Sequence, residues 1–299
     1  MYELIIIGAG PAGITAAVYA ARKKIKFLII SKDVGGQAAW SGDIENYTGY
    51  QFVTGPELAM KFEEHMKQFK VDLKEGEDVK SLEKSGDNFK VVTDKGSYEA
   101  QSIIIASGKK PRMLGVPGET KFKSKGVTYC ATCDGPLFSG KDVAVIGGGN
   151  SALDAALQMM KIANKVYLIN VNPELGGDAV MIEKVKKDPK VEIMNGTKTI
   201  EIYGEKFLTG MKVESQGKAR DLKVQGIFVE IGLIPNTDFV SIVEKNKAGE
   251  IVTDSNAKTS IEGVFAAGDV TNQPEKQIII AAGDGAKALL GAYSYLVHR

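Results

Sequence analysis

The chain has 299 residues, of which 43% are hydrophobic and 25% charged, and its formal net charge is +1. This balance is typical of a folded globular protein and excludes a disordered or fibrous chain. The small net charge argues against nucleic acid or an anionic membrane as a partner. No run of residues approaches the roughly 20 apolar residues of a membrane span, and the first apolar run is too short for a signal peptide, so we expect a cytoplasmic protein.

The N-terminal segment has the pattern of a βαβ unit. Residues 3–7 are rich in β-formers and lead into Gly8-x-Gly10-x-x-Gly13, residues 14–21 read as a helix of small residues, and residues 26–30 read as a second strand. Glycines at this spacing permit a tight turn and let a pyrophosphate approach the N–H groups of the helix. The context therefore predicts nucleotide binding here and not only a structural turn.

The end of the second strand does not identify the nucleotide. An acidic residue is expected there to bind a ribose, and the sequence instead has Ser31 and Lys32. Residues 35–37 and 45–47 follow in loops, where cofactor contact and ordinary turn chemistry are equally good interpretations.

Residues 89–106 predict strands of the same domain. Residues 89–93 and 97–101 look like a hairpin, and residues 102–106 look like a buried parallel strand. Residues 109–112 then read as a linker.

The two cysteines of the chain, Cys130 and Cys133, are separated by two residues. A structural zinc site needs about four ligands, and His65 and His298 are the only histidines, so we expect no metal site. A redox dithiol needs one attacking thiolate and a second sulfur that resolves the mixed disulfide, and this spacing supplies both. The adjacent Asp134 is a candidate for proton transfer at the departing thiolate, with a helix or turn cap as the alternative.

A second βαβ unit begins about 140 residues after the first. Residues 142–146 read as a strand that enters Gly147-x-Gly149-x-x-Ala152, residues 153–161 read as a helix, and residues 166–169 read as the next strand. Because each such unit needs its own sheet, the duplication predicts two nucleotide-type domains.

The second unit lacks the usual signals for either pyridine nucleotide. Its second strand ends at Asn170, where NAD would favour an acid and NADP an arginine. No arginine lies between Arg112 and Arg220, so a local arginine cannot bind a 2′-phosphate. Asn170 or Glu174 remains as a ribose contact, and a lysine such as Lys184 would be only a point charge, so NADPH is disfavoured.

The C-terminal segment resembles a continuation of the first domain. Residues 264–267 read as a strand that runs into Gly268-Asp269, where a carboxylate can accept a ribose or ribitol hydroxyl, and the last helix is expected over residues 278–296. The predicted fold class is therefore α/β, with two Rossmann-like domains, the second inserted into the first. We assign residues 1–110 and 241–299 to the first domain and residues 111–240 to the second.

Four motifs together resemble the low-molecular-weight thioredoxin reductases and the related reductase portion of the F component of alkyl hydroperoxide reductase. They are Gly8–Gly13, Cys130–Gly135, Gly147–Ala152 and Gly263–Val270, in the family order. The resemblance covers almost the whole chain and implies an FAD domain and a pyridine-nucleotide domain, both of the three-layer ββα type, and a homodimer.

The resemblance also implies residue roles. Cys133 would take electrons from the flavin, Cys130 would attack the disulfide of a thioredoxin-like protein, and Asp134 would be the general acid. The candidate cofactor contacts in the first domain are Gly8, Gly10, Pro11, Ala12, Gly13, Ser31, Gly36, Gln37, Asn46, Val79, Ala106, Ser107, Gly108, Gly268, Asp269, Lys276, Gln277 and Ile278. Those in the second domain are Gly147, Gly149, Asn150, Ser151 and Asn170. The family also alternates between two arrangements by rotating one domain, and the two predicted crossings suit that motion.

One departure from the family concerns the electron donor. NADPH-dependent members carry a basic cluster where this chain reads NVNPELGGDAV, which has no basic residue. The resemblance then leaves NADH, as in the hydroperoxide reductase relatives, or reduced ferredoxin, as in ferredoxin-dependent flavin thioredoxin reductases. Lys121, Lys123 and Lys125 are a candidate surface for an acidic ferredoxin, with an ordinary solvated face as the simpler interpretation.

The partner and the reaction direction also stay open. Because the chain starts at the FAD motif, we expect its thioredoxin-like partner, or a partner in a peroxiredoxin system, to be a separate protein. An FAD-dependent dithiol oxidase and a flavin-bearing redox sensor are the alternative functions.

Overall fold

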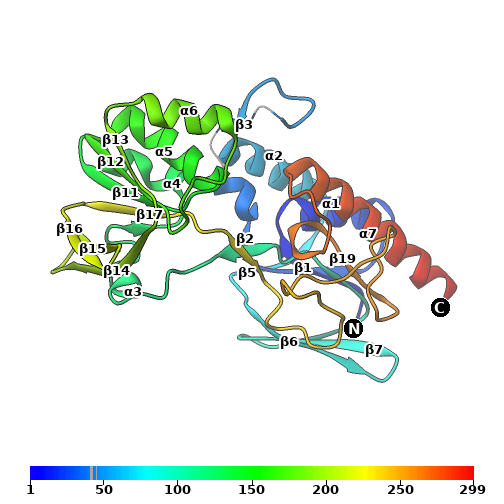
Figure 1. The fold of residues 1–299 in the computed structure, drawn as a ribbon. Coiled ribbons are helices and arrows are strands. Elements are labelled where there is room, and N and C mark those ends of the chain that lie inside the picture. The colour runs from blue at the N-terminus through cyan, green and yellow to red at the C-terminus, as the bar shows by residue number, and fades with distance from the viewer. Residues whose placement is uncertain (41–42, 45) are drawn as a thin grey trace. The chain divides into compact units, whose positions relative to one another are not determined.

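The computed structural model describes residues 1–40, 43–44 and 46–299, and of Trp40, Asp43 and Cys133 it describes the backbone. The chain forms two compact units (Figure 1): unit 1 contains Met1–Lys110 and Ile234–Arg299, and unit 2 contains Pro111–Leu233. The return connection lies before the predicted residue 241, because β18 (Leu233–Pro235) already pairs with β9 (Lys109–Pro111) in the outgoing connection.

Unit 1 is built on a sheet with the strand order β5-β2-β1-β8-β7-β6, and β19 pairs with β8. The parallel strands are β1 (Tyr2–Ala9), β2 (Phe27–Val34), β5 (Asp72–Glu75), β8 (Ser97–Ile105) and β19 (Val264–Ala266), and the antiparallel strands are β6 (Val79–Ser85) and β7 (Asn88–Thr93). The helices are α1 (Pro11–Arg22), α2 (Gly55–Lys67) and α7 (Ile278–His298), with the short elements η1 (Gly36–Trp40), β3 (Asp43–Ile44), β4 (Val53–Thr54) and η3 (Gly268–Val270).

β8 combines two of the predicted strands into one. Its first half completes the predicted hairpin, with Val91 opposite Tyr98 in β7. Its second half, the apolar run Ile103–Ile105, lies between β1 and β19, both parallel to it. A run buried on both faces is what the interior of a parallel sheet requires, so the hairpin and the buried strand are continuous.

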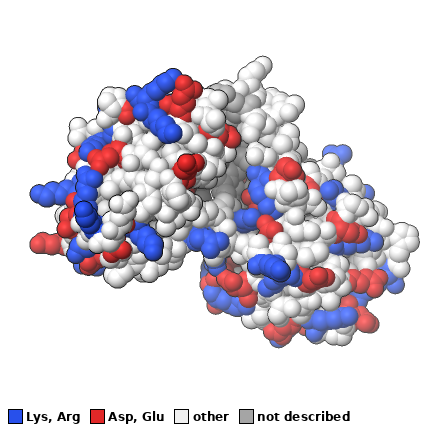
Figure 2. Space-filling view, in the orientation of Figure 1, with Lys and Arg blue, Asp and Glu red and all other residues white. Residues whose placement is uncertain are grey.

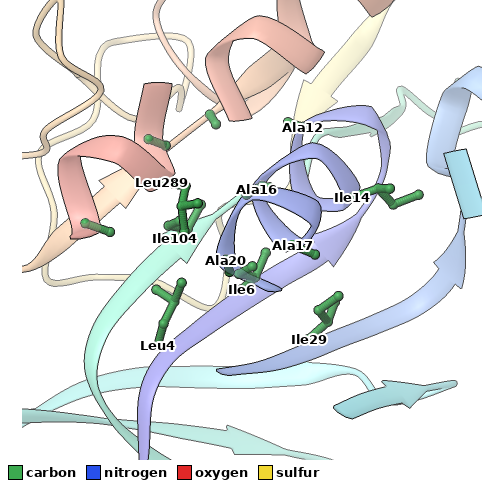
Figure 3. Packing of buried hydrophobic residues seen from close by; sticks show 14 of the residues in the cluster. Leu4, Ile6, Ala12, Ile14, Ala16, Ala17, Ala20, Ile29, Ile104 and Leu289 are labelled. Atoms are coloured by element: carbon green, nitrogen blue, oxygen red, sulfur yellow. The ribbon is translucent and has the colours of Figure 1, made fainter. Parts of the chain in front are cut away.

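Small residues on α1 let this helix lie close to the sheet and to α7. Ala16 and Ala20 of α1 are fully buried beside Leu289 of α7, and both helices cover Ile6 of β1 and Ile104 of β8 (Figure 3). At Gly285 in α7 an added Cβ would lie 2.0 Å from the Ala12 carbonyl oxygen, so no larger residue fits there. The opposite face of the parallel strands is covered by the antiparallel part of the sheet, where β6 and β7 contribute to a second apolar cluster.

Unit 2 repeats this three-layer plan on a five-stranded parallel sheet of order β10-β17-β11-β12-β13. Its strands are β10 (Val127–Thr128), β11 (Asp142–Ile146), β12 (Lys165–Ile169), β13 (Val191–Met194) and β17 (Gly226–Val229), and its antiparallel layer is β14 (Thr197–Gly204), β15 (Leu208–Ser215) and β16 (Lys218–Leu222). The helical elements are α3 (Glu119–Phe122), α4 (Ala131–Asp134), η2 (Gly135–Phe138), α5 (Asn150–Ile162) and α6 (Ala179–Lys187).

The alternation of β11 explains the two layers around this sheet. Val143 and Val145 belong to the apolar cluster under α5 and α6, whereas Ala144 and Ile146 belong to the cluster under β14–β16. All four side chains are buried, as expected for a central strand covered on both faces. The predicted α/β class with two Rossmann-like units, one inserted in the other, is confirmed.

Candidate active site

The first glycine turn joins β1 to α1 and is closed on one side and open on the other. Gly8 has φ +106°, and a Cβ added there would lie 2.3 Å from the Ala106 carbonyl oxygen. A Cβ at Gly13 would lie 1.9 Å from the Gly8 carbonyl oxygen. At Gly10, by contrast, an added Cβ meets no described atom within 4 Å. Gly8 and Gly13 therefore allow the backbone of the turn to pack closely, with no room for a side chain, while Gly10 faces open space.

The N-terminus of α1 has free hydrogen-bonding capacity. Gly10 is the residue before the helix, no side chain caps it, and Pro11 occupies the first turn. The first N–H groups of a helix have no partner within the helix, and they bind anions when a side chain does not cap them. The open side of the turn therefore has the chemistry of a pyrophosphate site.

The end of β2 and the residues that follow it lie close to this turn. Ser31 Oγ accepts a hydrogen bond from Ala9 N at 3.0 Å and donates to the Asp33 carbonyl at 2.6 Å. The hydroxyl therefore links the end of β1 to the backbone of β2. A Cβ added at Gly36 would lie 3.2 Å from Gly10 Cα. Gln37 Nε2 donates to the Lys109 carbonyl at 3.2 Å.

The C-terminal motif meets the same turn. A Cβ at Gly268 would lie 3.1 Å from the Ala12 side chain, which places the end of β19 beside the start of α1. Ser107 and Gly108 are held nearby by Asn236, which donates to the Ser107 carbonyl at 2.8 Å and, through its backbone N, to the Gly108 carbonyl at 2.9 Å. Asn236 was not predicted from the sequence, because its partners lie far away in the chain.

Asp269 follows directly and carries an unengaged carboxylate. Burial raises its pKa, the charges of Lys276 and Lys109 act in the opposite direction, and Asp284 adds a smaller upward effect. No described residue donates a hydrogen bond to this carboxylate. Lys109 and Lys276 instead pair with Glu250, at 3.0 and 3.3 Å. Asp269 is therefore an acceptor available to a bound hydroxyl group.

The remaining predicted cofactor contacts of unit 1 lie outside the glycine turn and the segments described above. Asn46 Nδ2 donates to Gln277 Oε1 at 3.0 Å, just before α7 begins at Ile278. Val79 opens β6 and packs against the apolar cluster on the other face of the sheet. Two residues of the predicted loop 45–47 are described, and Glu45 lies outside the described residues.

The second glycine turn, between β11 and α5, has the same construction. Gly147 has φ +142°, and an added Cβ would lie 2.1 Å from the Glu230 carbonyl oxygen. A Cβ at Gly149 meets no described atom within 4 Å, and no side chain caps α5. Asn150 and Ser151 are exposed at the start of α5, and Asn150 Oδ1 accepts a hydrogen bond from Asp178 N at 2.7 Å.

Asn170, the predicted ribose contact, is 1% exposed and fully engaged within the protein. Its Nδ2 donates to the Glu174 carbonyl at 2.8 Å and to Asn195 Oδ1 at 3.0 Å, and its Oδ1 accepts from Asn172 N at 3.1 Å. This side chain holds the loop that follows β12, so the arrangement favours a structural role for it. The loop itself contains no basic residue.

The cysteine motif forms a short turn at the end of β10. Cys130 is half-buried and disulfide-bonded. Its backbone N donates to Thr128 Oγ1 at 3.2 Å, and its carbonyl accepts from Asp134 N at 3.2 Å. The Thr128 hydroxyl in turn donates to Asp134 Oδ2, so Asp134 is tied to the strand that precedes the cysteine. The side chain of Cys133 lies outside the described part of the chain.

A buried carboxylate anchors the residue before Cys130. Glu119 is 1% exposed and accepts hydrogen bonds from the Tyr129 hydroxyl at 2.8 Å and from the backbone N of Leu114 and Gly115 at 2.8 and 2.7 Å. Burial and this bond to Glu119 raise the pKa of the Tyr129 hydroxyl. Neither Glu119 nor Thr128 was predicted, because single polar residues outside a motif give no sequence signal.

Glu230 is a further acidic group beside the second glycine turn. Burial, with a smaller contribution from the charge of Asp154, raises its pKa to about 8. It follows β17 directly and is therefore at the carboxyl edge of the parallel sheet, where ligands of such folds bind.

The three lysines predicted as a binding surface for ferredoxin are exposed, and two of them lie near aromatic rings. Lys121 Nζ lies 4.8 Å from the Phe122 ring centroid, and Lys123 Nζ lies 5.6 Å from that of Tyr129. On the face shown in Figure 2, basic and acidic side chains are interspersed over both units. This distribution favours a solvated surface. Within the described residues, no cluster of His, Cys, Asp and Glu could hold a metal ion, and no helix is long and apolar enough to cross a membrane.

Comparison with known proteins gives consistent matches. The family model described as pyridine nucleotide-disulphide oxidoreductase matches residues 2–285. A protein named NADH dehydrogenase from Ferdinandcohnia aciditolerans is 43% identical over 99% of this chain, and the F component of alkyl hydroperoxide reductase from Pseudomonas putida is 42% identical over 99%. The chain spans 58% of the length of each of these two relatives.

The fold has a close counterpart among solved structures. Thioredoxin reductase from Lactococcus lactis superposes with a TM-score of 0.91 at 36% identity, and the match covers 100% of both chains. The similarity therefore extends over both units and all four motifs.

Proposed function

The chain belongs to the pyridine nucleotide-disulphide oxidoreductase family, and from this we propose that it is a flavoprotein that reduces disulfides through Cys130 and Cys133. The observation that carries the proposal is the disulfide-bonded state of Cys130 in a turn that also holds Asp134. The chain contains two cysteines, separated by two residues, a spacing that lets one sulfur attack a disulfide and the other resolve the mixed disulfide.

The residues of unit 1 fit FAD. The uncapped N–H groups behind Gly10 suit its pyrophosphate, and the unengaged carboxylate of Asp269 suits a ribityl hydroxyl. When bound, FAD would supply a two-electron relay between a donor and the cysteine pair. Four of the predicted contacts shape the proposed FAD site mainly by supporting the backbone turns around it. They are Ser31, Gly36, Ala106 and Gly268.

The cysteines and Asp134 account for the disulfide chemistry. The Cys130 thiolate attacks the substrate disulfide, a mixed disulfide forms, and the first substrate thiolate leaves with the proton of Asp134. Asp134 then takes the proton of Cys133, and the Cys133 thiolate attacks Cys130. The second substrate thiolate leaves with that proton, so the substrate gains two electrons and two protons and the cysteines end as a disulfide.

We propose NADH as the donor in preference to NADPH. The loop after β12 carries Glu174 and Asp178 and no basic residue that could pair with a 2′-phosphate. The relatives named NADH dehydrogenase support the same choice. For the acceptor we propose a thioredoxin or a thioredoxin-like protein, on the basis of the thioredoxin reductase structures that match both units. The cytoplasmic location expected from the sequence and the homodimer implied by the family both stay predictions.

The donor is tested by anaerobic mixing of the FAD-loaded protein with NADH, NADPH or reduced ferredoxin. We expect NADH to bleach the flavin absorbance at least tenfold faster than NADPH. Bleaching by reduced ferredoxin alone would overturn the donor assignment and leave the disulfide chemistry intact.

The dithiol is tested with Cys130→Ser and Cys133→Ser. Each variant is expected to retain FAD and to lose more than about 100-fold of thioredoxin reduction, because one sulfur cannot both attack and resolve. Turnover retained in either variant contradicts the proposal. Hydrogen peroxide formed from a small dithiol under air, without thioredoxin reduction, would indicate a dithiol oxidase instead.

A further inference from the structure

The hydroxyl of Thr128 joins the two groups that the proposed disulfide chemistry uses. It accepts a hydrogen bond from Cys130 N at 3.2 Å and donates its only proton to Asp134 Oδ2. Thr128 itself is 6% exposed and pairs in register with Phe228 of β17, so it is fixed to the parallel sheet of unit 2. One side chain thus ties both the cysteine backbone and the carboxylate to a rigid strand.

The two oxygens of Asp134 differ as a result. Oδ2 is engaged by Thr128, and Oδ1 takes no hydrogen bond from the described residues. A carboxyl group that carries its proton on Oδ1 can still accept the Thr128 bond at Oδ2. The bond is therefore compatible with both protonation states of Asp134, and it leaves Oδ1 as the oxygen that can exchange a proton.

We propose that Thr128 is a positioning residue for proton transfer at the cysteine pair, acting through Asp134. The inference rests on the proposed function and deepens it. A general acid contributes only when it is held within hydrogen-bond reach of the leaving atom. Without the Thr128 hydroxyl, the Asp134 side chain keeps its chemistry and loses the contact that fixes it relative to Cys130.

The test uses two disulfides whose leaving thiolates differ in basicity. The thiolate released from 5,5′-dithiobis(2-nitrobenzoate) is weakly basic and leaves without a proton, whereas the thiolate from 2-hydroxyethyl disulfide is strongly basic and needs one. FAD-loaded protein is fully reduced with stoichiometric dithionite, which makes the assay independent of the natural donor. It is then mixed anaerobically with either disulfide, and the rate of the first turnover is measured.

Thr128→Val removes the hydroxyl and keeps the side-chain shape, and Thr128→Ser keeps the hydroxyl. We expect Thr128→Val to slow reduction of 2-hydroxyethyl disulfide about tenfold and to change the nitrobenzoate rate less than twofold, while Thr128→Ser stays close to wild type with both. In an Asp134→Asn background, Thr128→Val should add less than a twofold further loss, because the two changes remove the same step.

Three results would overturn the proposal. An equal loss with both disulfides would mean that Thr128→Val disturbs the turn as a whole. No loss with either would mean that the hydroxyl does not position Asp134. If Asp134→Asn were as fast as wild type with both disulfides, Asp134 would have no proton to position, although the cysteines could still be the working pair. Failure of wild-type protein to reduce either disulfide would instead contradict the proposed function itself.

Discussion

At Asp269, burial and nearby charge act on the same carboxylate in opposite directions. Burial raises its pKa, and the ammonium groups of Lys276 and Lys109 counteract part of that rise. Both lysines also pair with Glu250, so their charge is shared between two acids. A neutral hydroxyl donor can satisfy this carboxylate without bringing a further charge into the buried site. A ribityl hydroxyl is such a donor.

We predict that Asp269→Ala lowers FAD affinity by about 10- to 100-fold, which corresponds to the ~1.5–3 kcal/mol of a hydrogen bond to a charged group. Equilibrium dialysis against free FAD measures this directly. Asp238→Asn is the matched control, since Asp238 belongs to the same unit, is exposed and, among the described residues, forms its ion pair with Lys110. Equal affinities of Asp269→Ala and wild type would remove Asp269 from the cofactor site.

The residues of the site differed in how far the sequence could predict them. Cys130 and Asp134 could be proposed from one short motif, because the spacing of the two cysteines and the adjacent acid are enough to predict redox chemistry. Thr128 and Glu119 are not, since their importance comes from partners that only folding brings near: Glu119 meets Tyr129 and two backbone N–H groups. Asn170 shows the converse. Its position at the end of β12 predicted a contact with a ribose. In the folded chain, however, its side chain is buried and forms hydrogen bonds within the protein.

At the scale of elements, the two glycine turns were predicted because every interaction that defines them is local. A strand, a turn without side chains and a helix of small residues occupy consecutive positions, and α1 and α5 begin within three residues of where they were expected. The family resemblance implied a three-layer ββα domain, but the strands β14–β16 and the helix α2 were not predicted from the residues. The first depends on pairing between segments, and the second begins at a capping box between Thr54 and Glu57 inside a weakly apolar segment.

One glycine in each turn faces open space, and the two can be replaced in a matched pair of variants. Gly10 and Gly149 have negative φ, and an added Cβ at either meets no described atom within 4 Å, so alanine is expected to leave both folds intact. The new methyl group instead occupies the space that a pyrophosphate needs. We predict that Gly10→Ala weakens FAD binding at least tenfold and leaves NADH binding unchanged, and that Gly149→Ala does the reverse.

Flavin retention and NADH titration by calorimetry distinguish the two turns. Gly13→Ala is the control for folding, since a Cβ there would lie 1.9 Å from the Gly8 carbonyl oxygen and should reduce the yield of folded protein. If Gly149→Ala weakened FAD binding and Gly10→Ala did not, the assignment of the two units would be exchanged.

At the scale of the whole molecule, the chain crosses between two units that each have their own core. The apolar clusters on the two faces of the first sheet contain residues of unit 1, and those on the two faces of the second sheet contain residues of unit 2. Units with separate cores can unfold in separate transitions, so a substitution in one unit need not change the stability of the other.

Glu230 makes the stability of unit 2 depend on pH. Its pKa is about 8 in the folded chain, chiefly because of burial, and the ordinary value is 4.5. Between these values the folded state holds a proton that the unfolded state has released, so the free energy of unfolding falls as pH rises from 4.5 to 8. Below the ordinary value both states are protonated and this loss is absent. Above the folded-state value the buried carboxylate is charged and the loss is complete.

We predict that Glu230→Gln stabilises unit 2 relative to wild type by on the order of 1–3 kcal/mol at about pH 8.5, after discounting for the partial exposure of the side chain, and by much less at about pH 5. Thermal unfolding of unit 2 at the two pH values measures the difference, with a shift of several degrees expected at the higher pH. Glu174→Gln, an exposed acid of the same unit, should show no such dependence. A gain for Glu230→Gln that is equal at both pH values would mean that packing of the amide, and not removal of a buried charge, is responsible.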